Sequence, residues 1–179
     1  VYAGGFEDNA AGKNIAKIWK NGVPIILSSN SGLISDIYVA GGDVYAVGYE
    51  VNSAGKTVAK MWKNGTATSL TDGVANANAY GINVAGTDVY IAGNDGKFAK
   101  IWKNGVGTNL TVVGVNESSI VARSVAVHGN DVYVAGSYYG PVHSGSYDDH
   151  AVLWKNGVET PLEINDNLRA SNAITVIVK

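Results

Sequence analysis

Hydrophobic residues recur at every second position in short segments of this chain, and glycine, asparagine and aspartate separate those segments. Ile82-Asn83-Val84 is a typical segment, and the turn residues Gly86-Thr87-Asp88 follow it. A period of two, with many β-branched residues, is typical of β-strands, and no segment shows the 3.6-residue period of a helix. The pattern therefore predicts an all-β protein.

The strand pattern repeats four times. Trp-Lys-Asn-Gly occurs at 19–22, 62–65, 102–105 and 154–157 and accounts for all four tryptophans of the 179-residue chain. A Val-Tyr-x-x-Gly segment precedes each copy, starting at residues 1, 44, 89 and 132, a short strand follows, and an apolar-x-apolar triplet ends each unit. The units are about 1–43, 44–88, 89–131 and 132–179.

Four strands per unit of about 45 residues is the pattern of a β-propeller blade. We name the strands A (inner, such as 125–127), B (Val-Tyr-x-x-Gly), C (ending in Trp-Lys) and D (outer). Asn-Gly between C and D predicts a two-residue type I′ turn. The chain starts in a B strand and ends in an A strand, 172–179. We therefore expect one domain, 1–179, a four-bladed propeller of four-stranded antiparallel blades, closed by pairing of the C-terminal strand with the N-terminal strand.

The tryptophans have two interpretations. Each ring can pack as a wedge between neighbouring blades, where it buries roughly 150–250 Å², or the four rings can form platforms for sugars. Their identical position beside a tight turn favours the wedge.

Connections between strands differ on the two faces of such an array. The A–B and C–D turns are short and uniform, and we call their side the turn face. The B–C and D–A connections lie on the other side, the loop face, and the four B–C segments hold 10, 10, 5 and 14 residues. Variable loops on a rigid repeat commonly carry binding specificity, so we expect the ligand on the loop face.

Candidate binding residues come from two regions. Residues just before the A strands should rim the central channel at the loop face, and they differ between units, although polar residues at a wet channel mouth need no function. The longest B–C segment, 137–150, adds tyrosines, which suit sugar or protein contacts. The candidates for ligand binding are Ser35, Asp36, Tyr80, Arg123, Asn172, Tyr138, Tyr139 and Tyr147. His143, Asp148, Asp149 and His150 are candidates for a divalent-cation site, because imidazole and carboxylate suit zinc and similar ions.

Composition excludes several classes of function. The net charge of −2 supplies no basic field for phosphates, so we expect no nucleic-acid partner. The chain has no cysteine, hence no disulfide or thiolate chemistry, and no apolar run of the ~20 residues that span a bilayer. Motifs for a serine nucleophile or a phosphate loop are absent, which favours a protein that is not an enzyme and needs no cofactor beyond that candidate cation.

The repeated Asp-Val-Tyr segments (43–45, 88–90, 131–133) and the four Trp-Lys-Asn-Gly segments resemble the bacterial β-propeller repeat proteins with blades of this kind. The resemblance implies a secreted, periplasmic or surface-attached protein, with further blades or a second chain as potential partners. It says little about function, because propellers include enzymes, lectins and scaffolds.

The sequence thus favours a non-catalytic module that binds a glycan or a protein on its loop face. Two alternatives stay open. One is a polysaccharide hydrolase or lyase at the channel mouth, with Asp36 paired with Asp149 or Glu117, and the other is a structural spacer whose loops bind nothing.

Overall fold

The structure, a computed structural model, describes residues 1–115, 120–141, 147–162 and 175–178, and these form strands, turns and loops without a helix. None of the described residues therefore belongs to a helix that could cross a membrane. The strands are β1 (Tyr2–Asp8), β2 (Asn14–Lys20), β3 (Val23–Ala40), β4 (Asp43–Val51), β5 (Thr57–Lys63), β6 (Thr66–Ser69), β7 (Ala77–Ala85), β8 (Asp88–Asp95), β9 (Phe98–Lys103), β10 (Val106–Leu110), β11 (Ile120–His128), β12 (Asp131–Pro141), β13 (Tyr147–Lys155) and β14 (Val158–Pro161).

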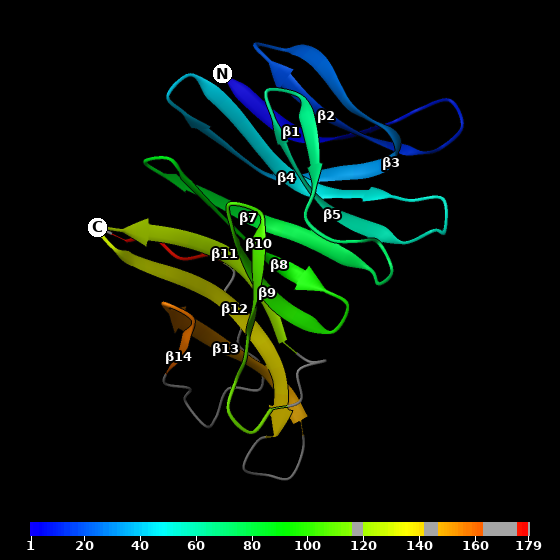
Figure 1. Cartoon of the computed structure of the whole chain (residues 1–179). Helices are drawn as coiled ribbons and strands as arrows, with labels where there is room; N and C mark the ends of the chain where they lie inside the picture. Colours follow the sequence, from blue (N-terminus) through cyan, green and yellow to red (C-terminus); the bar gives the residue numbers. More distant parts are fainter. Residues whose placement is uncertain (116–119, 142–146, 163–174, 179) are drawn as a thin grey trace.

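The strands form three antiparallel sheets, which confirms the all-β class (Figure 1). The predicted A–B–C–D order is present as β7-β8-β9-β10 and as β11-β12-β13-β14. The remaining strands form one six-stranded sheet, β1 to β6, because β3 runs without a break from the D position of the first unit into the A position of the second. When each unit is counted from its A strand, as the sheets require, the first unit consists of B, C and D strands alone in the described part of the chain.

The turns that follow the tryptophans have the predicted geometry. Their asparagines have φ between 50° and 53° and the glycines after them have φ between 80° and 85°. Positive φ at both central residues defines a type I′ turn, in which the twist matches that of the flanking strands. The residue pairs are Asn21-Gly22, Asn64-Gly65, Asn104-Gly105 and Asn156-Gly157.

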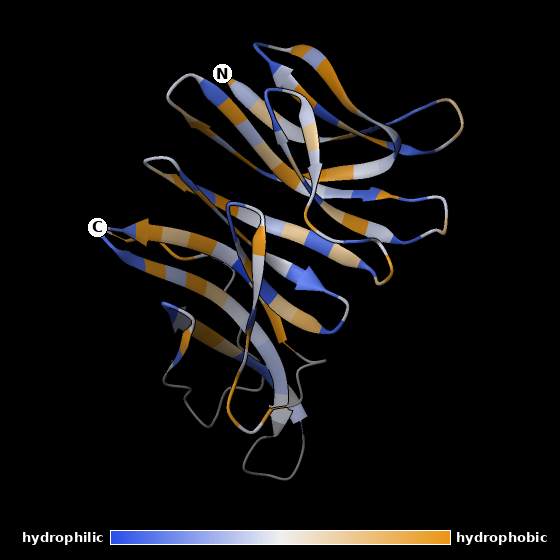
Figure 2. Ribbon diagram, viewed as in Figure 1, coloured by the Kyte–Doolittle hydropathy of each residue, from blue (hydrophilic) through white to orange (hydrophobic). Residues whose placement is uncertain are grey.

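Three cores with one tryptophan each lie between successive units, one of them inside the six-stranded sheet and the other two between neighbouring sheets. Trp62, Trp102 and Trp154 are at most 1 % exposed, and each belongs to a different cluster of buried residues. The indole Nε1 of Trp62 donates to the Leu27 carbonyl oxygen at 3.1 Å, and that of Trp154 to the Thr111 carbonyl oxygen at 2.8 Å. These three rings are wedges between neighbouring units and offer no platform to a sugar. Figure 2 shows the apolar bands alternating with polar ones along the strands that form these cores.

The turn face holds one hydrogen-bonded cluster three times. In the second unit, the Lys63 Nζ lies 2.7 Å from Asp43 Oδ2 and the Asn64 Nδ2 donates to Asp43 Oδ1 at 2.7 Å. The same lysine lies over the Tyr45 ring. These bonds join the A–B turn to the C–D turn of one sheet. The equivalent clusters are Asp88, Lys103, Asn104 and Tyr90, and Asp131, Lys155, Asn156 and Tyr133.

These clusters predict a pH-dependent stability. Hydrogen bonds from lysine and then from asparagine hold the pKa of Asp43, Asp88 and Asp131 below the ordinary aspartate value of 3.8. A carboxyl with a lowered folded-state pKa stabilises the fold above its unfolded pKa, and this stabilisation is lost as pH falls through the folded pKa. A triple variant with asparagine at all three positions should be less stable than wild type at pH 6, and the difference should shrink below about pH 4. Urea unfolding of both proteins between pH 2 and 7 measures it, and an equal difference at pH 2 and pH 6 would contradict the assignment.

The B–C and D–A connections lie together on the loop face, as predicted. The Asn52 Nδ2 donates to the Gly73 carbonyl oxygen at 2.9 Å, and the Thr57 N–H donates to Asn76 Oδ1 at 3.1 Å. The segments predicted as long loops are shorter than expected, because the antiparallel pairing continues into them. The 137–150 segment is strand at both ends, with Tyr138 opposite His150 and Pro141 opposite Tyr147.

The predicted closure of the sheets into a ring is not observed. Residues 175–178 belong to no strand, and the Val176 N–H donates to the Ser124 hydroxyl of β11 at 3.4 Å, while β1 pairs with β2. The sheets between β1 and β11 separate the two segments, so in this arrangement the tail lies beside the inner strand of the last sheet (Figure 1).

Candidate functional site

The inner strands β3, β7 and β11 each have one β-bulge in their pairing with the adjacent B strand, on the side toward the loop face. The register shifts between Ile34 and Asp36, between Ala79 and Gly81, and between Ala122 and Ser124. The extra residues are therefore Ser35, Tyr80 and Arg123. These are three of the residues that the sequence predicted at the channel rim, and all three occupy one structural position.

A glycine of the adjacent B strand makes room for each bulge. A Cβ atom at Gly48 would lie 1.8 Å from the Leu33 carbonyl oxygen, and one at Gly93 would lie 2.1 Å from the Asn78 carbonyl oxygen. Gly136 stands in the same relation to Val121, at 2.0 Å. A glycine within a strand often marks such a close approach of two backbones. The glycines of these three Val-Tyr-x-x-Gly segments therefore permit the bulges that display the candidate residues.

Neighbouring bulges touch one another. Asp36, next to Ser35, accepts the Ile82 N–H of β7 at 3.0 Å through Oδ2. A Cβ atom at Gly81, next to Tyr80, would lie 2.8 Å from the Arg123 carbonyl oxygen. Ser35, Tyr80 and Arg123 thus stand in adjacent inner strands at the loop-face end, and we call them the bulge row.

Asp36 differs from the other candidates, because both of its carboxylate oxygens are hydrogen-bonded to backbone. Oδ1 accepts the Ile37 N–H at 2.8 Å while Oδ2 accepts the Ile82 N–H. The side chain links two inner strands, which is a structural role that the sequence pattern did not predict. A carboxylate held in this way is poorly placed to act as a general acid or base.

Tyr80 is half-buried and lies among polar neighbours. Burial raises the pKa of its hydroxyl, the Arg123 charge and a hydrogen bond with Asn78 act in the opposite direction, and Tyr49 adds to the rise. The hydroxyl is consequently protonated at neutral pH and able to donate a hydrogen bond. Tyr49 and Asn78 were not predicted. Tyr49 follows the repeat glycine, at a position that also varies between units as Phe6, Asn94 and Ser137, and this variation was the signal that could have found it.

The β12–β13 hairpin arranges the aromatic candidates in two stacked pairs. Tyr138 stacks on His150 with ring centroids 4.8 Å apart, and Tyr139 stacks on Tyr147 at 5.8 Å. Tyr139 and Tyr147 are 52 % and 60 % exposed, whereas His150 is 9 % exposed. Because successive residues of a strand point to opposite faces, only the Tyr139–Tyr147 pair is open to a ligand.

The predicted cation site is not assembled in the part of the chain that the structure describes. No three histidine, aspartate or glutamate side chains there lie close enough to hold a metal ion. Asp149 is exposed and the neighbouring His150 is buried against Tyr138, so these two point to opposite faces of β13. His143 and Asn172 lie outside the described residues, as does the side chain of Asp148.

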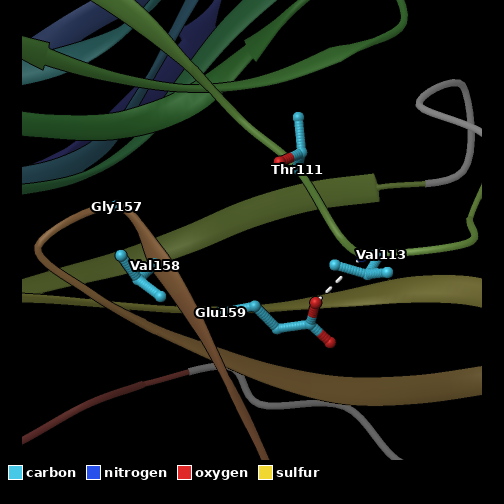
Figure 3. A pocket seen from close by; sticks show the side chains of 5 residues that line it. All are labelled: Thr111, Val113, Gly157, Val158 and Glu159. Carbon is cyan, nitrogen blue, oxygen red and sulfur yellow. Dashed lines mark hydrogen bonds between the residues drawn. The ribbon is translucent and has the colours of Figure 1, made fainter.

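A cavity of ≈ 500 Å³ lies between the third and fourth units, away from the bulge row (Figure 3). Thr111, Val113, Gly157, Val158 and Glu159 line it. The Glu159 carboxylate accepts the Val113 N–H at 2.9 Å and so ties the segment after β10 to β14. Glu159 is the one charged side chain among these lining residues, and this contact gives it a structural role. None of the binding residues predicted from the sequence lines the cavity. The bulge row is therefore the better candidate site.

The fold and the candidate site together define the class of this protein, an all-β chain of three antiparallel sheets in which the inner strands β3, β7 and β11 carry a row of bulges. No family model, curated protein or solved structure matches the chain.

Proposed function

We propose that the protein is a non-catalytic binding module that takes a glycan or a protein ligand on its loop face, at the bulge row. One observation carries the proposal. Three adjoining bulges hold serine, tyrosine and arginine, whereas the glycine, tryptophan and turn-face positions of the same units repeat almost unchanged. A uniform scaffold that presents different polar side chains at one equivalent position is typical of a binding surface.

The contacts of Asp36 favour binding over hydrolysis. The hydrolase alternative needs this carboxylate as one of a catalytic pair, and its oxygens are engaged by two backbone N–H groups. The exposed Tyr139–Tyr147 pair offers flat apolar area with hydroxyl groups, which suits contact with a sugar or a protein surface.

The proposal includes a finer description of the fold. We infer that the four units are blades of the propeller type, with their inner strands side by side around an axis. The contacts from Asp36 to Ile82 and from Gly81 to Arg123 support this arrangement, as does the Ser124–Val176 hydrogen bond, which sets the C-terminal segment beside β11. The tryptophan variants described in the Discussion test the packing on which it depends.

Alanine substitutions test the function. A glycan array and a quantitative pull-down should show binding by the wild-type chain, and Tyr80→Ala and Arg123→Ala should each weaken the retained ligand about tenfold or more, because each removes a hydrogen-bonding side chain from the site. Thr87→Ala, in an exposed A–B turn on the opposite face, is the control and should bind like wild type. Binding profiles that neither Tyr80→Ala nor Arg123→Ala changes would contradict the proposal.

A further inference from the structure

The charge of Arg123 is not compensated within the described part of the chain. Its Nε is buried and has no hydrogen-bond partner, and none of the ion pairs formed by the described residues includes it. The carboxylate at the far end of the bulge row, Asp36 of β3, is already hydrogen-bonded to two backbone N–H groups. A buried guanidinium N–H without an acceptor is unfavourable, and because the Arg123 side chain as a whole is only partly buried, a ligand carboxylate beside its exposed part would compensate its charge.

Arg123 lies beside Tyr80 of the neighbouring inner strand, Tyr80 is hydrogen-bonded to Asn78, and Ser35 stands in the next inner strand beyond Tyr80. Tyr80 has a protonated hydroxyl, Ser35 has an exposed one, and Asn78 has a side-chain amide. Tyrosine rings and hydroxyl groups beside a single cation suit a polyhydroxylated ligand with one carboxylate at this point. The guanidinium fork matches a planar carboxylate through two parallel hydrogen bonds.

The charge of the whole chain restricts the ligand further. Its net charge of −2 supplies no extended positive field, so a dense polyanion would gain little from the rest of the surface. A single arginine beside neutral hydrogen-bond donors instead suits a ligand that carries isolated carboxylates and is otherwise uncharged and rich in hydroxyl groups.

From this arrangement we propose that the bulge row binds an acidic glycan, with Arg123 holding the carboxylate of a uronic acid residue while the Tyr80 and Ser35 hydroxyls contact the sugar hydroxyls. The inference rests on the proposed function and narrows its ligand to carboxylated sugars.

Tetragalacturonate and its fully methyl-esterified form are the matched probes, because they differ only in whether the carboxylates are free. By isothermal titration calorimetry, wild type should bind the acid at least about tenfold more tightly than the ester. Arg123→Gln should abolish this preference, with the loss of affinity falling mainly on the acid. Arg123→Lys, which keeps the charge but not the fork, should retain part of the preference. Thermal unfolding of each variant checks that the fold is intact, and Thr87→Ala is the control on the turn face.

Four results would overturn the inference. Equal binding of acid and ester, or a preference that survives in Arg123→Gln, would remove the role of Arg123 while leaving a glycan-binding module in place. An aspartate tetrapeptide that binds as tightly as tetragalacturonate, with the same dependence on Arg123, would replace the sugar by a protein ligand. Absence of binding to both sugars, to neutral glycans and to the peptide would overturn the inference and the proposed function together.

Discussion

Replacing Trp62, Trp102 or Trp154 by alanine is expected to lower the free energy of unfolding by about 3–5 kcal/mol each. The three rings are at most 1 % exposed and fill the cores between neighbouring units, where partial relaxation would leave a cavity. Trp62→Ala and Trp154→Ala also leave the Leu27 and Thr111 carbonyl oxygens without their indole donor. Guanidinium chloride unfolding followed by far-ultraviolet circular dichroism measures the effect.

Trp19 is the matched control, because it occupies the same motif and the same turn. It lies in the first unit, is only partly buried, and is followed by the same Asn-Gly pair. Trp19→Ala should cost no more than about 1–2 kcal/mol, since part of the ring remains in water. A loss for Trp19→Ala as large as that for Trp62→Ala would show that another sheet covers the first unit, as in a closed ring, and would contradict the open arrangement.

Alanine at Gly48, Gly93 or Gly136 is expected to destabilise the protein by about 3 kcal/mol or more, at or above the upper end of the range for overpacked cores. The added methyl group would lie 1.8–2.1 Å from a backbone carbonyl oxygen of the bulge, and a backbone atom cannot move aside as a side chain can. At Gly93 the Trp102 ring, 2.9 Å away, blocks the other direction. Because the bulge must shift, Gly93→Ala should also weaken binding at Tyr80.

Gly5→Ala provides the comparison. Gly5 is the equivalent residue of the first unit, where no inner strand among the described residues lies beside β1, and a Cβ atom there would have the Trp19 ring as its nearest neighbour at an ordinary 3.5 Å. The free energy of unfolding of Gly5→Ala should lie within about 0.5 kcal/mol of wild type. If urea unfolding showed equal losses of unfolding free energy for Gly5→Ala and Gly93→Ala, the bulge would be excluded as the reason why each unit has glycine at this position.

Strand identity, strand order within a unit and turn type were predictable, because each depends on neighbouring residues in the chain. The short D strand predicted after the third Trp-Lys-Asn-Gly segment is β10, and the Asn-Gly pairs have the expected positive φ values. Repetition strengthened these local signals. The repeat also predicted that the tryptophans pack between units. Trp19 is only partly buried, which shows that burial of the ring also requires a neighbouring unit.

The site was predictable as a set of positions and not as a geometry. Alignment of the units placed Ser35, Tyr80 and Arg123 at equivalent positions. That each of them is the additional residue of a β-bulge depends on the strand with which it pairs, and the alignment does not show this. The role of Asp36 escaped prediction because its partner, Ile82, is 46 residues further along the chain. The 137–150 segment was predicted as a loop because its sequence shows no clear alternation of apolar and polar residues. In the structure its two ends pair with each other as strands.

The amino-acid sequence by itself determined the β-strands, the type I′ turns and the repeat, since backbone conformation and side-chain alternation are properties of adjacent residues. Tertiary structure alone decided that β3 joins two units in one sheet, that the tail lies beside β11, and that Arg123 has an unpaired Nε. These features depend on which strands meet across space, and no pattern along a single strand specifies its neighbour.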